Sequence, residues 1–289
     1  MFKKVSIIGL GLIGGSIAAG LKTRGLVERV SAFDADTMAL ENGLRQQVID
    51  EKADSVEVCA TDSDLVVLAV PVLSIRGTLA SLETVFKSKS CIVTDVGSVK
   101  SPIIQTAEEL FGQLPENLVP GHPIAGSEKH GVTAANPDLF ENHKVILTPT
   151  ESVSEQATGT VKELWRALGA NVIEMTPGHH DGVFAQTSHL PHLLAYALVD
   201  MLSVQGDSLE IFQYAAGGFR DFSRIAASDP VMWRDIFSAN QDEVLISLDR
   251  YMQELGDIRR MISDGKTQEL EELFQRAKVA RDYFSGLGE

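Results

Sequence analysis

The chain contains few cysteines and far fewer basic than acidic residues. Cys59 and Cys91 are the two thiols among 289 residues, and their spacing matches neither a metal site nor a disulfide framework. This scarcity predicts a reducing compartment, the cytoplasm. The chain has 25 Lys and Arg against 40 Asp and Glu, a formal net charge of −15. Nucleic acid and anionic membranes are therefore not expected as partners, and any anionic ligand must be bound by a local cluster of cations.

Long apolar runs are missing as well. No segment reaches the roughly 18 uninterrupted apolar residues of a membrane-spanning helix. Lys3 and Lys4 precede an apolar run that ends near Gly20, as in a secretion signal, but four glycines interrupt this run. The composition, 44% hydrophobic and 22% charged, is typical of a soluble globular protein. The length is sufficient for two compact domains.

The glycines near the N-terminus follow a pattern of strand, glycine-rich turn and helix. Residues 5–8 predict a buried strand, and the sequence GLGLIG follows at once. In this pattern the glycines permit a tight turn and a close approach of a pyrophosphate to the helix N-terminus. Asp34 ends the next expected strand, 20 residues beyond Gly14, where a carboxylate accepts from the adenosine ribose and favours NAD over NADP. The predicted cofactor-binding residues here are Gly9, Gly11, Leu12, Ile13, Gly14 and Asp34.

Strands and helices alternate up to about Thr176, which predicts an N-terminal Rossmann-like domain over residues 1–176 with a mostly parallel sheet. Further strands are expected at residues 65–70, 91–94, 144–148 and 171–175, and the last of these is expected to close the sheet. Ligands bind at the carboxyl ends of parallel strands. Val70, Pro71, Gly97 and Ser98 are therefore predicted on the nicotinamide side, although Ser98 alternatively caps the helix that follows.

From Pro177 onward apolar residues recur at helical spacing, which predicts an all-helical domain over residues 177–289. Its apolar stripes are broad for a small domain, so we expect a homodimer that buries helical surface. The recurring residues include Leu190, Leu193, Leu194, Ala197, Leu198, Met201, Leu245, Leu248, Met252, Leu255, Ile262, Leu270, Leu273 and Phe274.

Residues 121–131, GHPIAGSEKHG, combine three glycines, a proline and two histidines. Pro123 biases His122 toward an extended backbone, so we expect its imidazole at a strand end. A neutral imidazole has a pKa suited to accepting a proton near neutral pH. His122 is therefore the predicted catalytic base, whereas His130 and His143 are expected on the surface.

Two arginines in the sequence GFRDFSR supply the local cations that an anionic ligand requires. If this segment is helical, Arg220 and Arg224 share a face and can bind carboxylates. The alternative is that each forms a structural ion pair. His189 and His192 are predicted to line the same cleft. No metal is expected, because the spacing supplies too few ligands and adjacent residues such as His180 and Asp181 face different ways on a helix.

Five stretches together resemble the prephenate dehydrogenase family of tyrosine biosynthesis: GLGLIGGS, DVGSVK, GHPIAGSEKHG, TSHLPH and GFRDFSRIAASDPVMWRDI. They are spread over nearly the whole chain. The resemblance implies NAD-dependent oxidative decarboxylation of prephenate to 4-hydroxyphenylpyruvate, or of arogenate to tyrosine, with tyrosine as a possible competitor.

The resemblance also implies residue roles. His122 accepts the proton of the ring hydroxyl while hydride leaves the same carbon for NAD. Ser98 hydrogen-bonds that hydroxyl, and Arg224 binds the side-chain carboxylate. The remaining polar surroundings of the pocket are His192, Ser188 and Glu128.

Two alternative functions remain open on the sequence. One is a 3-hydroxyacid-type NAD dehydrogenase, a family that typically uses a lysine on the helix after the sheet, where this chain has histidines. The other is a non-catalytic NAD-binding sensor. A sensor needs only residues 9–34 to bind NAD, and this function would not explain His122 and the two arginines.

Overall fold

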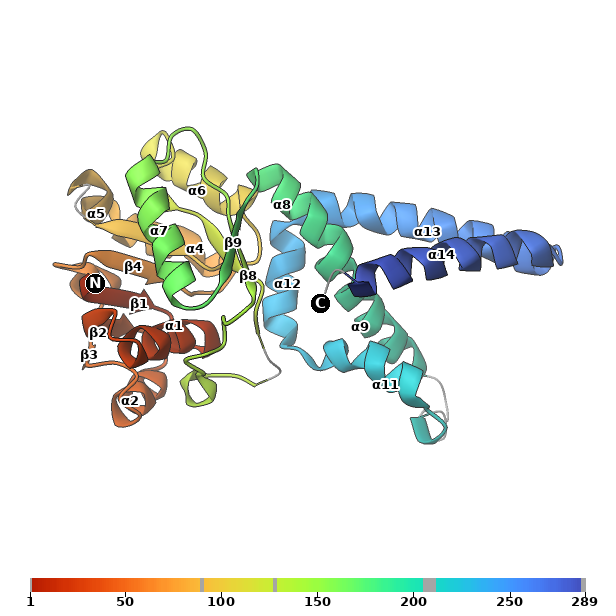
Figure 1. The fold of residues 1–289 in the computed structure, drawn as a ribbon, viewed down its shortest axis with the longest axis horizontal. Helices are drawn as coiled ribbons and strands as arrows, with labels where there is room; N and C mark the ends of the chain where they lie inside the picture. Colours follow the sequence, from red (N-terminus) through yellow and green to blue (C-terminus); the bar gives the residue numbers. More distant parts are fainter. Residues whose placement is uncertain (1, 89–90, 127–128, 205–211, 287–289) are drawn as a thin grey trace. The chain divides into compact units, whose positions relative to one another are not determined.

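The computed structural model describes residues 2–88, 91–126, 129–204 and 212–286. The chain divides into two compact units, Met1–Gln241 and Asp242–Glu289, and each is considered by itself. The first unit joins a sheet region to a set of helices, and the second is a pair of helices (Figure 1).

The first sheet has six strands, all parallel, in the order β3-β2-β1-β4-β5-β6. Continuous apolar runs form its centre, since every residue of β4 is buried. From β1 the chain first adds β2 and β3 on one side and then β4, β5 and β6 on the other. The order of the strands therefore reverses between β1 and β4, and dinucleotides bind at this point in this fold. The strands are β1 (Phe2–Ile8), β2 (Val27–Phe33), β3 (Glu51–Lys52), β4 (Leu65–Leu68), β5 (Ile92–Asp95) and β6 (Leu118–Val119).

Helices return the chain between these strands, and the alternation expected from the sequence is confirmed. After β4 the chain forms a short 3-10 turn followed by two helices. The elements between these strands are α1 (Leu12–Thr23), α2 (Thr37–Arg45), α3 (Val56–Ala60), η1 (Val72–Ser74), α4 (Ile75–Ser81), α5 (Glu83–Ser88) and α6 (Ser101–Phe111), and α7 (Glu155–Ala167) follows later in the chain.

The expectation that one sheet continues to residue 175 is wrong, because a separate sheet of three strands follows β6. Here β7 (Gly121–Pro123) pairs antiparallel with β8 (Lys144–Leu147), and β8 pairs parallel with β9 (Asn171–Glu174). Pro120 lies between β6 and β7 and has no amide hydrogen to continue a ladder. This second sheet carries His122, which lies opposite Ile146.

The described residues of the first unit that follow β9 are mostly helical, as expected. Asp229 caps one of these helices, since its Oδ1 accepts from the amides of Val231 and Met232, both at 2.8 Å. The buried Trp233 and Ile236 of this helix belong to the same apolar core as the sheet. The elements are α8 (Pro177–Phe184), the π-helical segment η3 (Ala185–His189), α9 (Leu190–Ser203), α11 (Gly217–Ser223), η4 (Arg224–Ala227) and α12 (Pro230–Ala239).

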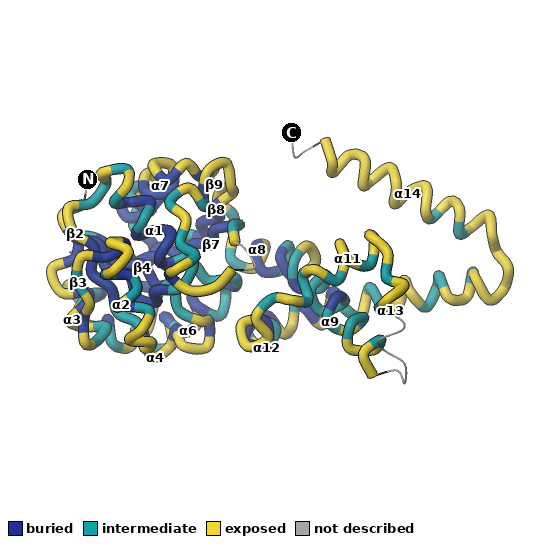
Figure 2. The backbone as a smooth tube through the Cα atoms, turned by 90° about the horizontal axis from the view of Figure 1, so that it is seen from below, coloured by how far each residue is buried: buried dark blue, intermediate teal, exposed yellow. Residues whose placement is uncertain are grey.

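The second unit consists of α13 (Gln241–Ser263) and α14 (Thr267–Gly286). Gly265, with φ +67°, turns the chain between them. No residue of α14 is buried, and Figure 2 shows this helix exposed along its length. The pair therefore presents much of its apolar surface to solvent.

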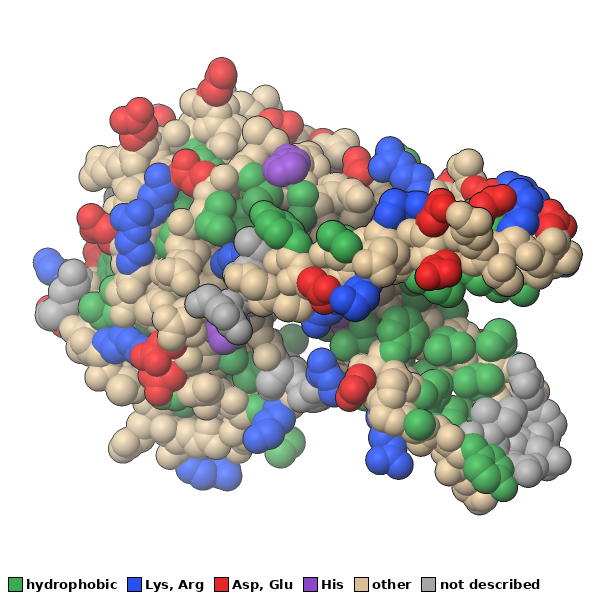
Figure 3. Space-filling model, turned by 45° about the vertical axis from the view of Figure 1, so that its right-hand side comes forward, with side chains coloured by type: hydrophobic (Ala, Val, Ile, Leu, Met, Phe, Trp, Pro, Cys, Tyr) green, Lys and Arg blue, Asp and Glu red, His purple; other side chains and the backbone are tan. Residues whose placement is uncertain are grey.

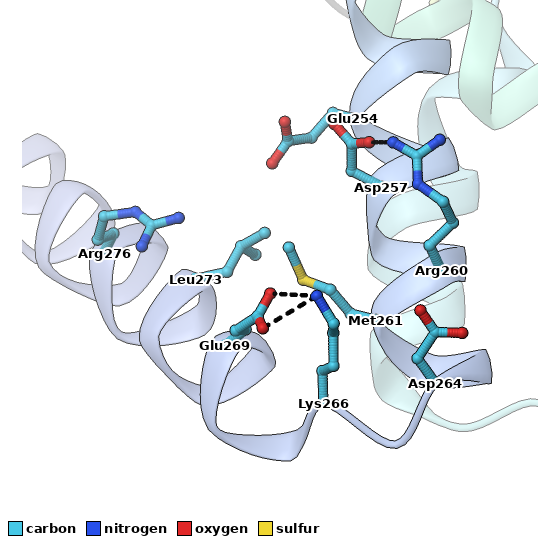
Figure 4. Close-up of a pocket in the computed structure, with 9 residues that line it drawn as sticks. All are labelled: Glu254, Asp257, Arg260, Met261, Asp264, Lys266, Glu269, Leu273 and Arg276. Atoms are coloured by element: carbon cyan, nitrogen blue, oxygen red, sulfur yellow. Dashed lines mark hydrogen bonds and ion pairs between the residues drawn. The ribbon is translucent and has the colours of Figure 1, made fainter.

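A hollow of about 340 Å³ lies where these two helices meet (Figure 4). Its charges are mostly paired: Lys266 Nζ lies 3.1 Å from Glu269 Oε1, and Arg260 pairs with Asp257. The apolar lining comes from Met261 and Leu273. Acidic and basic groups of similar number line the hollow.

Acidic and basic side chains are interspersed over the face seen in Figure 3, in spite of the net charge. None of the described helices combines the length and the apolar character needed to cross a bilayer.

A buried ion pair links three elements of the first unit. Lys100 and Asp95 are 0% and 1% exposed, and their side chains form a salt bridge. Lys100 Nζ also donates to the carbonyl of Gly121 at 2.6 Å, while Asp95 accepts from the amides of Gly97 (2.8 Å) and Gly121 (3.2 Å). Burial lowers the pKa of Lys100, and the charge of Asp95 opposes this shift. The end of β5, the start of α6 and the start of β7 are thereby fixed to one another.

Lys100→Met should destabilise the first unit strongly, because the carboxylate of Asp95 then stays buried without its cation. We expect a loss of about 3 to 5 kcal/mol in the free energy of unfolding, measured by urea denaturation. The matched control is Lys87→Met, which removes an exposed pair with Glu83 and should cost at most about 0.5 kcal/mol. Equal losses in the two variants would contradict a structural role for Lys100.

Candidate active site

The glycine turn after β1 meets the end of β4. Gly9 has φ +96°, and a Cβ there would lie 2.4 Å from the carbonyl oxygen of Ala69. At Gly14 a Cβ would lie 2.1 Å from the oxygen of Gly9. A side chain at either position would clash with the backbone, so the fold requires glycine there whether or not a ligand binds. A Cβ on Gly11 would meet nothing within 4 Å. The protein therefore leaves open space at this residue.

The residues around the turn fit a dinucleotide. Helix α1 begins at Leu12 and has no side-chain cap, so its first amides, including that of Ile13, are available to an anion. Asp34 follows β2 and lies beside the turn, where its Oδ2 accepts from the amide of Leu10 at 2.6 Å. Its Oδ1 accepts from Asp36 at 2.8 Å. Each oxygen keeps a lone pair for a ribose hydroxyl.

The predicted nicotinamide contacts lie at the carboxyl ends of two neighbouring strands. Val70 and the exposed Pro71 follow β4, and the half-buried Gly97 and Ser98 follow β5. The alternative role of Ser98 as a helix cap is wrong, because the cap position of α6 is Lys100 and its side chain makes no capping bond. The first amides of α6 are instead bonded by a side chain from α8.

His122 lies in the middle of β7 and is half-buried. Its Nδ1 is 2.8 Å from Nε2 of His180, and its ring packs on Phe184 with 4.9 Å between centroids. Burial lowers the pKa of His122 well below its ordinary value, and the nearby His180, Lys100 and His189 lower it further. The imidazole is therefore neutral at neutral pH, the state that a base requires.

His180 and Asp181 are functional candidates that the sequence reasoning missed. His180 is fully buried, and its Nδ1 lies 2.8 Å from Oδ1 of Asp181. Asp181 also accepts from the amides of Lys100 and Ser101 at the start of α6, both at 2.8 Å. The two neighbours on α8 were expected to face different ways, yet both side chains turn to α6 and β7. The density of polar residues in PGHHDG was the available signal.

A second polar group lies on the helices that follow. His192 on α9 stacks on Trp233 of α12, with 3.7 Å between ring centroids and 22° between planes. Its Nδ1 lies 2.8 Å from the carbonyl oxygen of Ser188 in the π-helical segment. His189 is 1% exposed, and its Nδ1 is 3.1 Å from Nδ2 of Asn240. Burial lowers the pKa of His189 to about 4.

Asn240 connects the two groups. Its Nδ2 donates to the carbonyl oxygen of Asp181 at 3.0 Å as well as facing His189. A continuous row of contacts therefore leads from His122 through His180, Asp181 and Asn240 to His189.

Both arginines are exposed, but they do not share one regular helix. Arg220 lies on α11, which ends at Ser223, and Arg224 begins the 3-10 segment η4. Arg224 lies near His192: burial is the main cause that lowers the pKa of this histidine, and the charge of Arg224 adds to it. Tyr196 Oη donates to the carbonyl oxygen of Ser228 at 2.6 Å and holds this segment against α9.

Some predicted features fall outside this arrangement. Glu128 lies outside the described residues, so its position stays untested. His130 and His143 are exposed, as expected. A common cavity for His122 and Arg224 stays a prediction. Within the described ranges, no three His, Cys, Asp or Glu side chains gather in a way that could hold a metal ion.

Two family profiles match consecutive parts of the chain. The profile described as the nucleotide-binding domain of prephenate dehydrogenase matches residues 17–174, and that of its dimerization domain matches residues 176–276. The prephenate dehydrogenase of Bacillus subtilis is 38% identical over 98% of this chain and 76% of its own length.

Two solved structures are similar over nearly their whole length. The Aquifex aeolicus prephenate dehydrogenase, in complex with hydroxyphenyl propionate and NAD+, has a TM-score of 0.89 and 36% identity, covering 97% of this chain and 98% of its own. The Synechocystis arogenate dehydrogenase has a TM-score of 0.80 and 31% identity, covering 97% and 99%.

Gly11→Ala should weaken NAD binding without harming the fold. The backbone of Gly11, with φ −81° and ψ −158°, is open to alanine, and its Cβ would occupy only the space assigned to the cofactor. We expect the dissociation constant of NAD, measured by calorimetry, to rise at least about tenfold, or about 1.4 kcal/mol.

The control for this variant is Gly77→Ala on α4, where a Cβ also meets open space. That change should leave NAD binding unaltered and the fold as stable or up to about 1 kcal/mol more stable. Unchanged NAD affinity in Gly11→Ala would place the cofactor elsewhere.

Proposed function

Because the chain belongs to the prephenate dehydrogenase family, we propose that it catalyses the NAD-dependent oxidative decarboxylation of prephenate to 4-hydroxyphenylpyruvate. The observation that carries this proposal is a neutral, half-buried imidazole, His122, which lies on β7 and contacts His180. The neighbouring Gly121 donates its amide to Asp95 at the carboxyl end of β5. The A. aeolicus relative holds NAD+ together with hydroxyphenyl propionate, which shares its phenol ring and carboxylate with the proposed product.

The chemistry divides between the cofactor and the protein. When bound, NAD would supply the acceptor for a hydride from the ring carbon that bears the hydroxyl. His122 accepts the proton of that hydroxyl, and the Ser98 hydroxyl orients it by a hydrogen bond. The ring carboxylate leaves as carbon dioxide, and its bonding electrons complete the aromatic ring. Gly97, Val70 and Pro71 would border the nicotinamide.

The substrate is a dianion, so cations must bind it in a chain of net charge −15. We assign the side-chain carboxylate to Arg224, which lies beside His192 at the start of η4. Ser188 and His192 border the same place on η3 and α9. The proposed surroundings of the substrate also include Arg220, His189 and Glu128. His189 is buried, so we place it behind the residues that contact the substrate.

Arogenate is a second candidate substrate. It differs from prephenate by an amino group in place of the side-chain keto group, and a 31% identical relative is named arogenate dehydrogenase. Tyrosine carries a phenol ring and a carboxylate, as the proposed product does, so we propose it as a competitive inhibitor. Rates with prephenate and arogenate in competition would rank the two substrates.

The alternative functions have less support. A 3-hydroxyacid-type dehydrogenase would need a lysine after the sheet, and α8 and η3 contain none. Lys100 does not replace it, since this side chain is fully buried and bonded to Asp95 and Gly121. A sensor without catalysis would not explain the hydrogen-bonded histidines behind His122.

NADH formation with prephenate, followed by absorbance, tests the proposed function. His122→Asn should lower kcat about 100-fold or more, because general base catalysis contributes at least that factor. NAD binding should be nearly unchanged, since His122 lies outside the glycine turn. His143→Asn, an exposed histidine, is the matched control and should keep full activity.

Two outcomes would count against this assignment. An unchanged kcat in His122→Asn would remove this histidine from the mechanism. Absence of NADH formation with both prephenate and arogenate in the wild-type protein would overturn the proposed function itself.

We propose further that residues 177–289 form the substrate-binding and dimerisation domain and that the protein is a homodimer. The family profile that matches residues 176–276 is that of the dimerization domain of prephenate dehydrogenase. Helices α13 and α14 expose large apolar side chains, as expected of a surface that a partner covers. They include Leu245, Ile246, Met252, Leu255, Ile262, Phe274, Val279, Tyr283 and Phe284.

Light scattering at micromolar concentration should therefore give twice the chain mass of 31.3 kDa. Phe274→Glu, which places a charge on this apolar surface, should shift the mass toward one chain. Gln275→Glu adds the same charge next to it and should preserve the dimer. A wild-type mass equal to one chain would contradict the proposal.

A further inference from the structure

His122, His180 and Asp181 form a hydrogen-bonded row that ends at the proposed base. We infer that His180 and Asp181 are positioning residues, which keep the proton of neutral His122 on Nδ1 and so leave the lone pair of Nε2 free to accept the substrate proton. The kinetic consequence of this inference rests on the function proposed above, whereas the tautomer itself does not.

The row starts from an ionised carboxylate. Burial disfavours the charge of Asp181, but hydrogen bonds from His180, from Ser101 and from the amides of Lys100 and Ser101 outweigh it and lower the pKa of this carboxyl. The two amides belong to the start of α6, where a negative charge is also favoured by the helix dipole. An ionised carboxylate only accepts hydrogen bonds.

The carboxylate determines the tautomer of His180. Because Asp181 Oδ1 can only accept, the proton between these residues lies on His180 Nδ1, 2.8 Å away. Burial lowers the pKa of His180, although Asp181 opposes the shift. His180 is therefore neutral at neutral pH. A neutral imidazole with its proton on Nδ1 carries a lone pair on Nε2.

His180 in turn determines the tautomer of His122. The lone pair of His180 Nε2 faces His122 Nδ1 at 2.8 Å, so Nδ1 of His122 must be the donor. Neutral His122 then has no proton on Nε2. The reverse arrangement would require His180 to donate from both nitrogens, which is a buried cation and is disfavoured by the lowered pKa.

The packing holds both rings in this geometry. Phe184, one turn after His180 on α8, contacts His122 and His180 with ring centroids 4.9 and 4.6 Å apart. The charged and titratable groups that face the pair are Lys100, Asp95, Asp181 and His189. Lys100 and Asp95 neutralise each other, so the carboxylate of Asp181 is the unbalanced charge.

This charge has its largest effect after proton transfer. When His122 Nε2 has taken the substrate proton, the ring is a cation whose Nδ1 donates to His180, and His180 donates to Asp181. The negative carboxylate thus stabilises the cation through one neutral ring, as the aspartate does in a Ser-His-Asp triad.

The tautomer can be measured without cofactor or substrate. We expect two-bond ¹H–¹⁵N correlations of protein labelled with ¹⁵N-histidine at neutral pH to show His122 and His180 protonated on Nδ1, with signals assigned by loss in His122→Asn. In Asp181→Asn an amide group turned with its nitrogen toward His180 Nδ1 would donate to it, so a share of His122 should become protonated on Nε2. A wild-type His122 protonated on Nε2 would overturn the inference.

The kinetic arm uses the same variants. Asp181→Asn should lower kcat about 100-fold or more, with the KM for NAD and for prephenate changed by less than about threefold because no direct contact is lost. Ser154→Ala removes the side-chain cap of another helix, α7, and controls for lost capping of α6. Equal losses of kcat in Asp181→Asn and Ser154→Ala would reduce Asp181 to a structural role.

Two substitutions at His180 keep the test valid if Asp181→Asn does not fold. His180→Gln retains an oxygen that can accept from His122 Nδ1, whereas His180→Leu has none. The glutamine variant should retain at least about tenfold more kcat than the leucine variant, in line with a contribution of about 1.4 kcal/mol from the retained hydrogen bond. Equal activities would show that the position acts by packing alone. An inactive wild-type protein with the expected tautomers would contradict the proposed function but not the inference.

Discussion

The burial of Asp95, Lys100 and Asp181 constrains the first unit more than any other feature. An unpaired charge in such a place costs several kcal/mol, so each of these groups must keep its partners. Lys100 Nζ bonds to Asp95 and to the carbonyl of Gly121, and the amides of Lys100 and Ser101 bond to Asp181. The segment between β5 and α6 is thereby held by side chains from β5 and α8 and by the backbone of β7.

The same contacts set the geometry of His122. The carbonyl oxygen of Gly121 accepts a hydrogen bond from Lys100 Nζ. The next residue along β7 is His122, which lies opposite Ile146 of β8. Asp181 fixes α8 against the start of α6, and its neighbour His180 reaches His122. Strand and helix therefore cannot shift independently without breaking a buried ion pair or a helix cap. A base held in this way needs little reorganisation when the reaction takes place.

The sequence predicted the features that local chemistry determines. Gly9 and Gly14 are dictated by a turn packed against β4, and a run such as Leu65–Leu68 is apolar because both of its faces are covered. The sequence also identified His122, since the proline after it favours extended backbone. The helical character of the described residues from Pro177 onward followed from spacing alone.

The features that tertiary contacts determine were missed. The separate sheet of β7, β8 and β9 depends on where the chain turns at Pro120, and parallel or antiparallel pairing leaves no clear mark in short apolar strands. The partners of Asp181 lie 80 and 81 residues earlier in the chain. Its role at the start of α6 is a long-range cap, whereas capping rules consider only neighbouring residues, and so Ser98 was considered instead.

The electrostatics of the histidines explain why the arginines are needed. The pKa values of His122, His180, His189 and His192 are all lowered, and burial is the main cause in each case. Four rings near the proposed substrate site thus contribute polar contacts without positive charge. Lys100 is paired with Asp95, and we propose that Arg220 and Arg224 supply the positive charge that the substrate requires. The net charge of −15 repels a dianion at long range, but salt screens that repulsion beyond about 8 Å. Recognition of the substrate therefore depends on close, charge-assisted contacts with these arginines, each worth about 1.5 to 3 kcal/mol, next to a base that stays neutral until it takes the proton.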